Sequence, residues 1–119
     1  MSYLMRSKSE LSNAIKNSIK GFVVVWNGEV AFRQYTVLSL LLIPLAFWFG
    51  GNNVEKVLML ISVLLVLLME LLNTAIEAVV DRIGSEQHEL SAAAKDIGSA
   101  AVFLSIVMFA VTWLMILVS

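Results

Sequence analysis

Hydrophobic and polar positions divide the chain into four helical segments. Between Leu11 and Trp26, apolar residues recur every three or four positions, and lysines and asparagines take the opposite face. This spacing predicts an amphipathic helix over about residues 5–27, which either lies at a membrane surface or packs on a bundle. Three longer apolar runs follow, at about 30–49, 57–80 and 97–118, and each is long enough to cross a bilayer.

The breaks between these segments are short. Gly28 predicts a bend after the first helix, residues 50–53 predict a tight turn, and residues 81–96 form a polar connection. Pro44 lies inside the first span, where a membrane helix tolerates it. We therefore expect an all-α membrane protein with one integral membrane domain over residues 1–119.

Basic residues indicate the orientation of the spans. They gather before or at the start of the first span and between the second and third, while Lys56 lies on the opposite side. The positive-inside rule then predicts a cytoplasmic N-terminus and a multi-pass protein. In this orientation Trp48 and Trp113 lie at the outer interface, and Trp26 lies at the inner one.

Composition excludes several classes of function. Of the 119 residues, 60% are hydrophobic and 14% are charged, which is too apolar for a small soluble domain. Eight basic residues against nine acidic ones leave a net charge of −1, so we expect no nucleic-acid partner. The chain has no cysteine, which excludes thiol nucleophiles and disulfides. Its polar start predicts no cleavable signal peptide.

The second span carries polar side chains on one face. Glu70, Asn73, Glu77 and Asp81 project within about 80° of one another on a helix. Glu70 lies about 10 Å deeper in the membrane than Glu77. A charged group at such a depth costs about 3 kcal/mol, so an ionisable residue inside a span is a functional hypothesis by default.

Two interpretations of this polar face are open. In one, Glu70 and Asn73 hydrogen-bond between helices, with Glu70 protonated. In the other, the carboxylates bind a hard cation such as Mg²⁺, whose remaining ligands are water and substrate phosphate. Glu29 opens the first span at the depth of Glu77, and Lys95 and Asp96 open the third span at the same level. This combination favours a phosphorylated ligand.

Common catalytic motifs are absent from the sequence. It contains no GxxxxGK[ST] or GxGxxG phosphate loop and no GxSxG nucleophile motif. His88 is the single histidine and has no partner at metalloprotease spacing. A nucleotide site would therefore be built from side chains.

Residues 70–81, ELLNTAIEAVVD, match the pattern E-x-[LIVM]-N-[ST]-[SA]-[LIV]-E-x-x-V-D at all positions. This segment resembles the signature of the prokaryotic diacylglycerol kinase family. The similarity continues through 82–86, 88–91, 94–96 and 98–102, and it includes Glu29 and residues 31–34 upstream. It covers about residues 15–118.

The resemblance implies a small integral kinase of the bacterial inner membrane. The family forms a homotrimer with three spans and one N-terminal surface helix per subunit. It transfers the γ-phosphate of MgATP to the hydroxyl of diacylglycerol and so makes phosphatidic acid. ATP, diacylglycerol, membrane lipid and further copies of the chain are the expected partners, and Mg²⁺ is the expected cofactor.

The resemblance also implies roles for individual residues. Glu70 corresponds to the general base on the lipid hydroxyl, while Glu29 and Glu77 correspond to the ligands of the ATP-bound Mg²⁺. The nucleotide would also contact Asn73, Glu86, His88, Lys95 and Asp96. The lipid would contact Glu70, Ser99, Trp48, Trp113 and the stretch Ala31, Phe32, Arg33, Gln34 and Tyr35.

The surface helix departs from the family. Well-known members have basic or aromatic residues where this chain has Glu10, Asn13, Asn17 and Val23, so nucleotide contacts from this helix are not carried over. Two alternatives remain at this point. One is an undecaprenol kinase of the same family, and the other is a non-enzymatic small membrane subunit.

Overall fold

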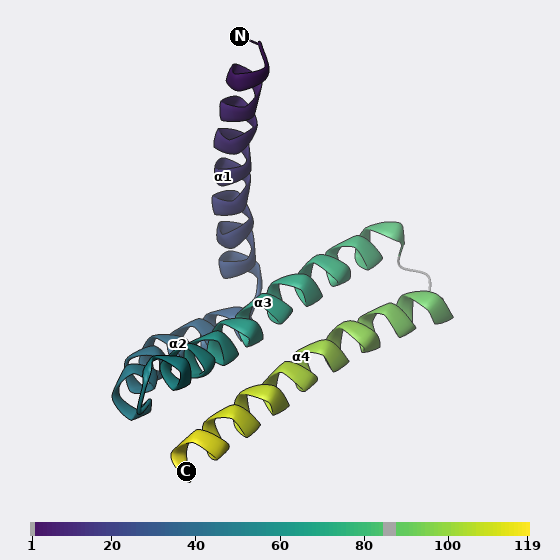
Figure 1. The fold of residues 1–119 in the computed structure, drawn as a ribbon. Helices are drawn as coiled ribbons and strands as arrows, with labels where there is room; N and C mark the ends of the chain where they lie inside the picture. Colours follow the sequence, from purple (N-terminus) through teal and green to yellow (C-terminus); the bar gives the residue numbers. More distant parts are fainter. Residues whose placement is uncertain (1, 85–87) are drawn as a thin grey trace. The chain divides into compact units, whose positions relative to one another are not determined.

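The computed structural model describes the backbone of residues 2–84 and 88–119, and the side chains of these ranges from residue 9 onward. All regular structure in the described residues is helical, which confirms the all-α expectation. Figure 1 shows the four helices, α1 (Ser2–Gly28), α2 (Val30–Phe49), α3 (Asn53–Ile83) and α4 (Glu89–Leu117). They form two units, residues 1–30 and residues 31–119.

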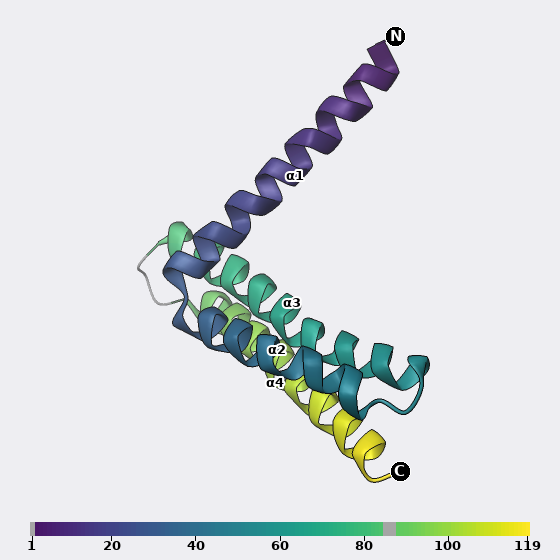
Figure 2. The same cartoon turned by 90° about the vertical axis from the view of Figure 1, so that its left-hand side faces the viewer.

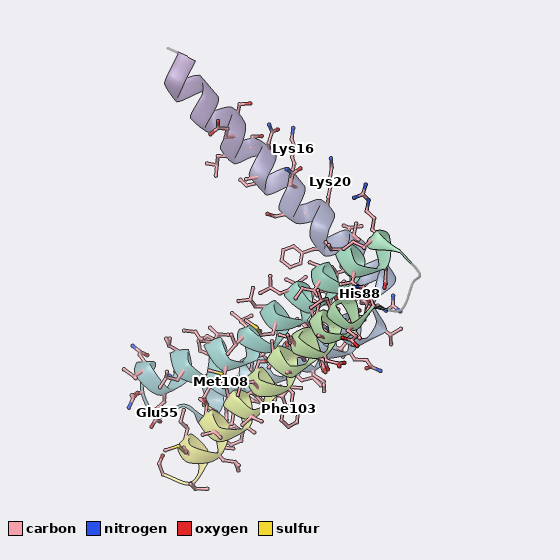
Figure 3. The ribbon with its side chains drawn as sticks, turned by 90° about the vertical axis from the view of Figure 1, so that its right-hand side faces the viewer. Lys16, Lys20, Glu55, His88, Phe103 and Met108 are labelled. Carbon is pink, nitrogen blue, oxygen red and sulfur yellow. The ribbon has the colours of Figure 1, made fainter. Side chains whose placement is uncertain are left out.

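The first unit consists mainly of the helix α1. Lys16 and Lys20 are one turn apart and project from the same side of this helix (Figure 3). Apolar Leu11, Ile15 and Ile19 are also exposed within the described residues. Glu29, which belongs to no helix, separates α1 from α2.

The second unit contains α2, α3 and α4 (Figure 2). The α2 helix continues through Pro44, as membrane helices can. Each of α2, α3 and α4 is long and apolar enough to cross a membrane, as the sequence predicted. Their outer faces carry exposed apolar side chains, among them Phe103 and Met108 of α4 (Figure 3), which suit contact with lipid.

A capped turn joins α2 to α3. Asn52 Oδ1 accepts a hydrogen bond from the Glu55 amide at 2.9 Å, and Glu55 Oε1 accepts one from the Gly51 amide at 2.7 Å. The pairing is similar to a capping box, except that Glu55 accepts from the residue before the N-cap Asn52. With this cap, α3 begins at Asn53, before the apolar run expected at 57. A Cβ on Gly50 would lie 2.9 Å from the Ala46 carbonyl oxygen, so the turn requires glycine there.

The connection between α3 and α4 is shorter than the polar run 81–96 indicated. Helix α3 continues to Ile83, and α4 begins at Glu89, where His88 Nδ1 accepts a hydrogen bond from the Leu90 amide at 3.0 Å. Hydropathy marks where a helix leaves the lipid, whereas the helix itself ends at its caps. Most residues of the expected connection are therefore helical.

A small core holds the three helices together near the α2–α3 turn. Ala46, Met59, Val63 and Trp113 are its buried residues, one or two from each helix. The Trp113 indole N–H donates to the Met59 carbonyl oxygen at 3.3 Å and to Ser62 Oγ at 3.1 Å. Because both acceptors belong to α3, this side chain of α4 ties the two helices together at that level.

We expect Trp113→Phe to lower the free energy of unfolding by about 1 kcal/mol, because the ring stays while the two interhelical hydrogen bonds are lost. Unfolding in detergent micelles measures the change. Trp48→Phe is the matched control, since Trp48 is 81% exposed. Equal stability of the two variants would contradict this account of Trp113.

Candidate functional site

The polar face of α3 runs from the buried part of the bundle to its exposed end. Glu70 and Asn73 are 6% and 9% exposed, Glu77 is half-buried and Asp81 is exposed. Successive members lie three or four residues apart, so they occupy one helical face. We call these four residues the acidic stripe. Its burial decreases over about 16 Å of helix.

Asn73 connects the inner and outer parts of the acidic stripe. Its Nδ2 atom donates a hydrogen bond to Glu77 Oε1 at 3.3 Å, one helical turn away. This bond orients the half-buried carboxylate of Glu77 from the more deeply buried part of the stripe. The amide of Asn73 thus has a direct influence on where Glu77 points.

Lys95 brings a positive charge from α4 to this stripe. Its Nζ atom lies 2.6 Å from Asp81 Oδ1, and the two side chains are 44% and 66% exposed. Lys95 precedes the apolar run that starts at Ile97. The hydrogen bond and charge of Asp81, with a smaller contribution from the charge of Glu77, raise the pKa of Lys95. Lys95 therefore remains a cation beside the two carboxylates.

Other residues expected to contact nucleotide lie at the same end of the bundle. His88 is the N-cap of α4 and lies far from Glu55, which marks the opposite end of the bundle (Figure 3). Asp96 is exposed, one residue after Lys95. Glu86 lies outside the described residues. Lys95, Asp96 and His88 thus lie at the end of the bundle where the acidic stripe is exposed, and Lys95 is the one with a contact to the stripe among the described residues.

The residues expected to contact lipid occupy different places. In the stretch 31–35, Phe32 is buried and Gln34 is exposed, while Ala31, Arg33 and Tyr35 are half-buried. Ser99 and Trp48 are exposed, and Trp113 is buried in the core. Its contact Ser62 lies about 12 Å along α3 from Glu70. The structure therefore does not bring Trp113 together with Glu70.

An apolar groove lies beside the inner end of the stripe. It has a volume of about 160 Å³, and α2, α3 and α4 all contribute to its walls. Tyr35 and Ser39 line it from α2, and Val66 lines it from α3. Val66 is one helical turn from Glu70, on the same face. The groove therefore lies one helical turn from Glu70, toward the apolar part of α3.

Glu29, the other expected metal ligand, belongs to the first unit and is half-buried. Within the ranges that the structure describes, no three His, Asp or Glu side chains gather as a metal-binding group. The stripe offers carboxylate oxygens, which are the donors that hard cations prefer. Mg²⁺ is usually held by one or two carboxylates together with water and phosphate, so this donor set fits MgATP.

Sequence reasoning gave no role to Asp81 beyond its place on the stripe. Its contact with Lys95 depends on how α3 and α4 align, and the sequence of either helix alone does not show that alignment. The spacing of four residues between Glu77 and Asp81 places Asp81 on the stripe but does not indicate its partner in α4.

Comparison with known proteins identifies close relatives. The model of the family described as prokaryotic diacylglycerol kinase matches residues 16–117. A diacylglycerol kinase from Haemophilus influenzae is 46% identical over 93% of this chain and 94% of its own length. Those from Escherichia coli and Pseudomonas aeruginosa are 51% and 49% identical, over 84% and 88% of this chain and 82% and 85% of their own lengths.

We expect Asp81→Asn to lower the free energy of unfolding by at most about 1 kcal/mol, because its ion pair with Lys95 is exposed and screened. Unfolding in micelles at low and high salt measures this, and the difference shrinks at high salt. Asp96→Asn, at an exposed acid beside Lys95, is the control. A large, salt-independent loss would show that the pair is essential for folding.

Proposed function

Because this chain belongs to the prokaryotic diacylglycerol kinase family, we propose that it is an ATP-dependent diacylglycerol kinase of the membrane. The family match covers residues 16–117, and relatives named diacylglycerol kinase align over most of both chains. The chain transfers the γ-phosphate of MgATP to the hydroxyl of diacylglycerol and makes phosphatidic acid. In the structure, this function is supported by the acidic stripe. The stripe runs from the buried carboxylate of Glu70 to the exposed ammonium group of Lys95.

Glu70 is the proposed general base. Glu70 as a residue is 6% exposed, and it lies one helical turn from Val66 of the apolar groove. A lipid whose acyl chain occupies this groove would present its hydroxyl near the buried end of the stripe. A base within hydrogen-bond reach of that hydroxyl can remove its proton as the new phosphorus–oxygen bond forms and the bond from the γ-phosphorus to the departing ADP breaks.

The nucleotide belongs at the exposed end of the stripe. Lys95 places its ammonium group there and can neutralise charge on the phosphates. Glu77 and Glu29 are the proposed ligands of the ATP-bound Mg²⁺, while Asn73, Glu86, His88 and Asp96 would position the nucleotide. Held by these residues, Mg²⁺ would supply positive charge that neutralises the charge developing on the phosphates.

The two substrates would then meet along α3. Glu70 and Glu77 are separated by about 10 Å of helix, so lipid and nucleotide approach the stripe from its two ends. Phosphoryl transfer needs chiefly positioning and charge neutralisation, and these residues supply both without a glycine-rich loop. Ser99, Trp48, Trp113 and residues 31–35 remain proposed lipid contacts.

We also propose a homotrimer in the bacterial inner membrane with a cytoplasmic N-terminus. Three helices do not surround a polar stripe on all sides, and polar groups in lipid need protein or water around them. Further copies of the chain can supply that cover. The basic residues before and after the first pair of spans support the orientation.

We expect Glu70→Gln to lower turnover of MgATP with diacylglycerol by at least about 100-fold, because the amide cannot accept the hydroxyl proton. Steady-state rates in mixed micelles measure the loss. Glu55→Gln is the matched control, since Glu55 lies on the same helix at the far end and serves the α2–α3 turn. Both variants should unfold like the parent protein.

Equal turnover of the two variants would contradict the role of Glu70. Loss of activity that accompanies unfolding of Glu70→Gln would instead support the interpretation in which Glu70 only holds the helices together. The two interpretations therefore differ in a stability measurement as well as in a rate.

A further inference from the structure

Gly98 of α4 lies directly against Asn73 of α3. Gly98 is buried, and a Cβ built on it would collide with Asn73 Oδ1. The same Cβ would lie 3.4 Å from Asn73 Cγ and 3.6 Å from Ile76 Cδ1. The side chain of Asn73 thus occupies the space that any other residue at position 98 would fill.

This approach determines how the Asn73 amide is used. The Oδ1 atom is buried against α4 and has no hydrogen-bond partner in the described residues. The Nδ2 atom, on the other side of the amide, donates to Glu77 Oε1 at 3.3 Å. Weak contacts between backbone Cα–H groups and oxygen occur at close helix interfaces and suit an amide oxygen held against a glycine.

We propose that Gly98 is a positioning residue for Glu77, acting through Asn73. The missing side chain at position 98 leaves room for the amide oxygen, and the amide nitrogen is thereby aimed at the Glu77 carboxylate. This inference rests on the proposed function, in which Glu77 is a ligand of the ATP-bound Mg²⁺. The inference gives α4 a second role at the metal-binding end of the site. In addition to supplying Lys95, this helix would hold Glu77 in position through Gly98.

Close packing of two membrane helices alone would also favour a glycine. The two roles differ in where a methyl group at position 98 would act. The colliding atom is the end of the Asn73 side chain, so rotation of that side chain relieves the collision while the helices stay in place. The hydrogen bond to Glu77 is then lost, because the rotated amide of Asn73 no longer points at the Glu77 carboxylate.

The inference is tested by measuring how the turnover of Gly98→Ala depends on Mg²⁺ concentration at a fixed ATP concentration. We expect the Mg²⁺ concentration for half-maximal turnover to rise about tenfold, the usual scale for losing a hydrogen bond to a charged group. In an Asn73→Ala background, Gly98→Ala should cause no further rise, because the amide through which it acts is absent. Ala100→Val, which adds bulk at an exposed position of α4, is the control and should leave the Mg²⁺ dependence unchanged.

An unchanged Mg²⁺ dependence in folded Gly98→Ala overturns the inference, and so does an equal rise in the Asn73→Ala background. If Gly98→Ala fails to fold, the double variant decides. If the double variant folds, the collision acts through Asn73 and the inference is supported. If the double variant also fails to fold, the inference is overturned.

A readout without turnover separates this inference from the proposed function. With asparagine amides isotopically labelled, the Asn73 side-chain resonance should shift in Gly98→Ala and in Glu77→Gln. An unchanged resonance in Gly98→Ala overturns the inference even in an active enzyme. Absence of diacylglycerol phosphorylation by the parent protein overturns the proposed function, whatever the resonance shows.

Discussion

A carboxylate buried in an apolar helix bundle is the constraint on which the rest of the molecule depends. Glu70 is buried in the middle of α3, in a bundle whose helices are apolar enough to cross a membrane, and a charge at such a position is costly. The same helix face continues through Asn73 and Glu77 to Asp81, so polar groups lead from the buried carboxylate to water. A reaction between a membrane lipid and a water-soluble nucleotide needs such a path, because its substrates come from two different solvents.

The two ends of the bundle have different tasks. Near the α2–α3 turn, Trp113 hydrogen-bonds across to α3, and the side chains of Asn52 and Glu55 cap the start of that helix. At the other end, α4 supplies Lys95 to the exposed part of the stripe and Gly98 to the buried part. Packing thus aligns α3 and α4 at one end, and that alignment determines which polar groups meet at the other.

Sequence periodicity predicted the elements better than their ends. The 30–49 run coincides with α2, because the apolar run stops where the glycine turn begins. Helices α3 and α4 extend past their apolar runs, because charged residues outside the lipid still favour a helix. The acidic stripe was predicted from helical spacing alone, since all its members lie on one element.

Contacts between helices could not be predicted in this way. The pair Lys95–Asp81 and the approach of Gly98 to Asn73 depend on the alignment of α3 with α4. Trp113 was expected at the outer interface, and its burial depends on which face of α4 meets α3. The roles of Glu29, Glu77 and the lipid contacts come from resemblance to the family and stay predictions.

The central claim is tested most directly by incubating the purified, folded protein with γ-labelled MgATP and either diacylglycerol or undecaprenol, in separate mixed micelles. The account predicts label in phosphatidic acid and none in undecaprenyl phosphate, whereas an unlabelled lipid fraction in both would contradict it.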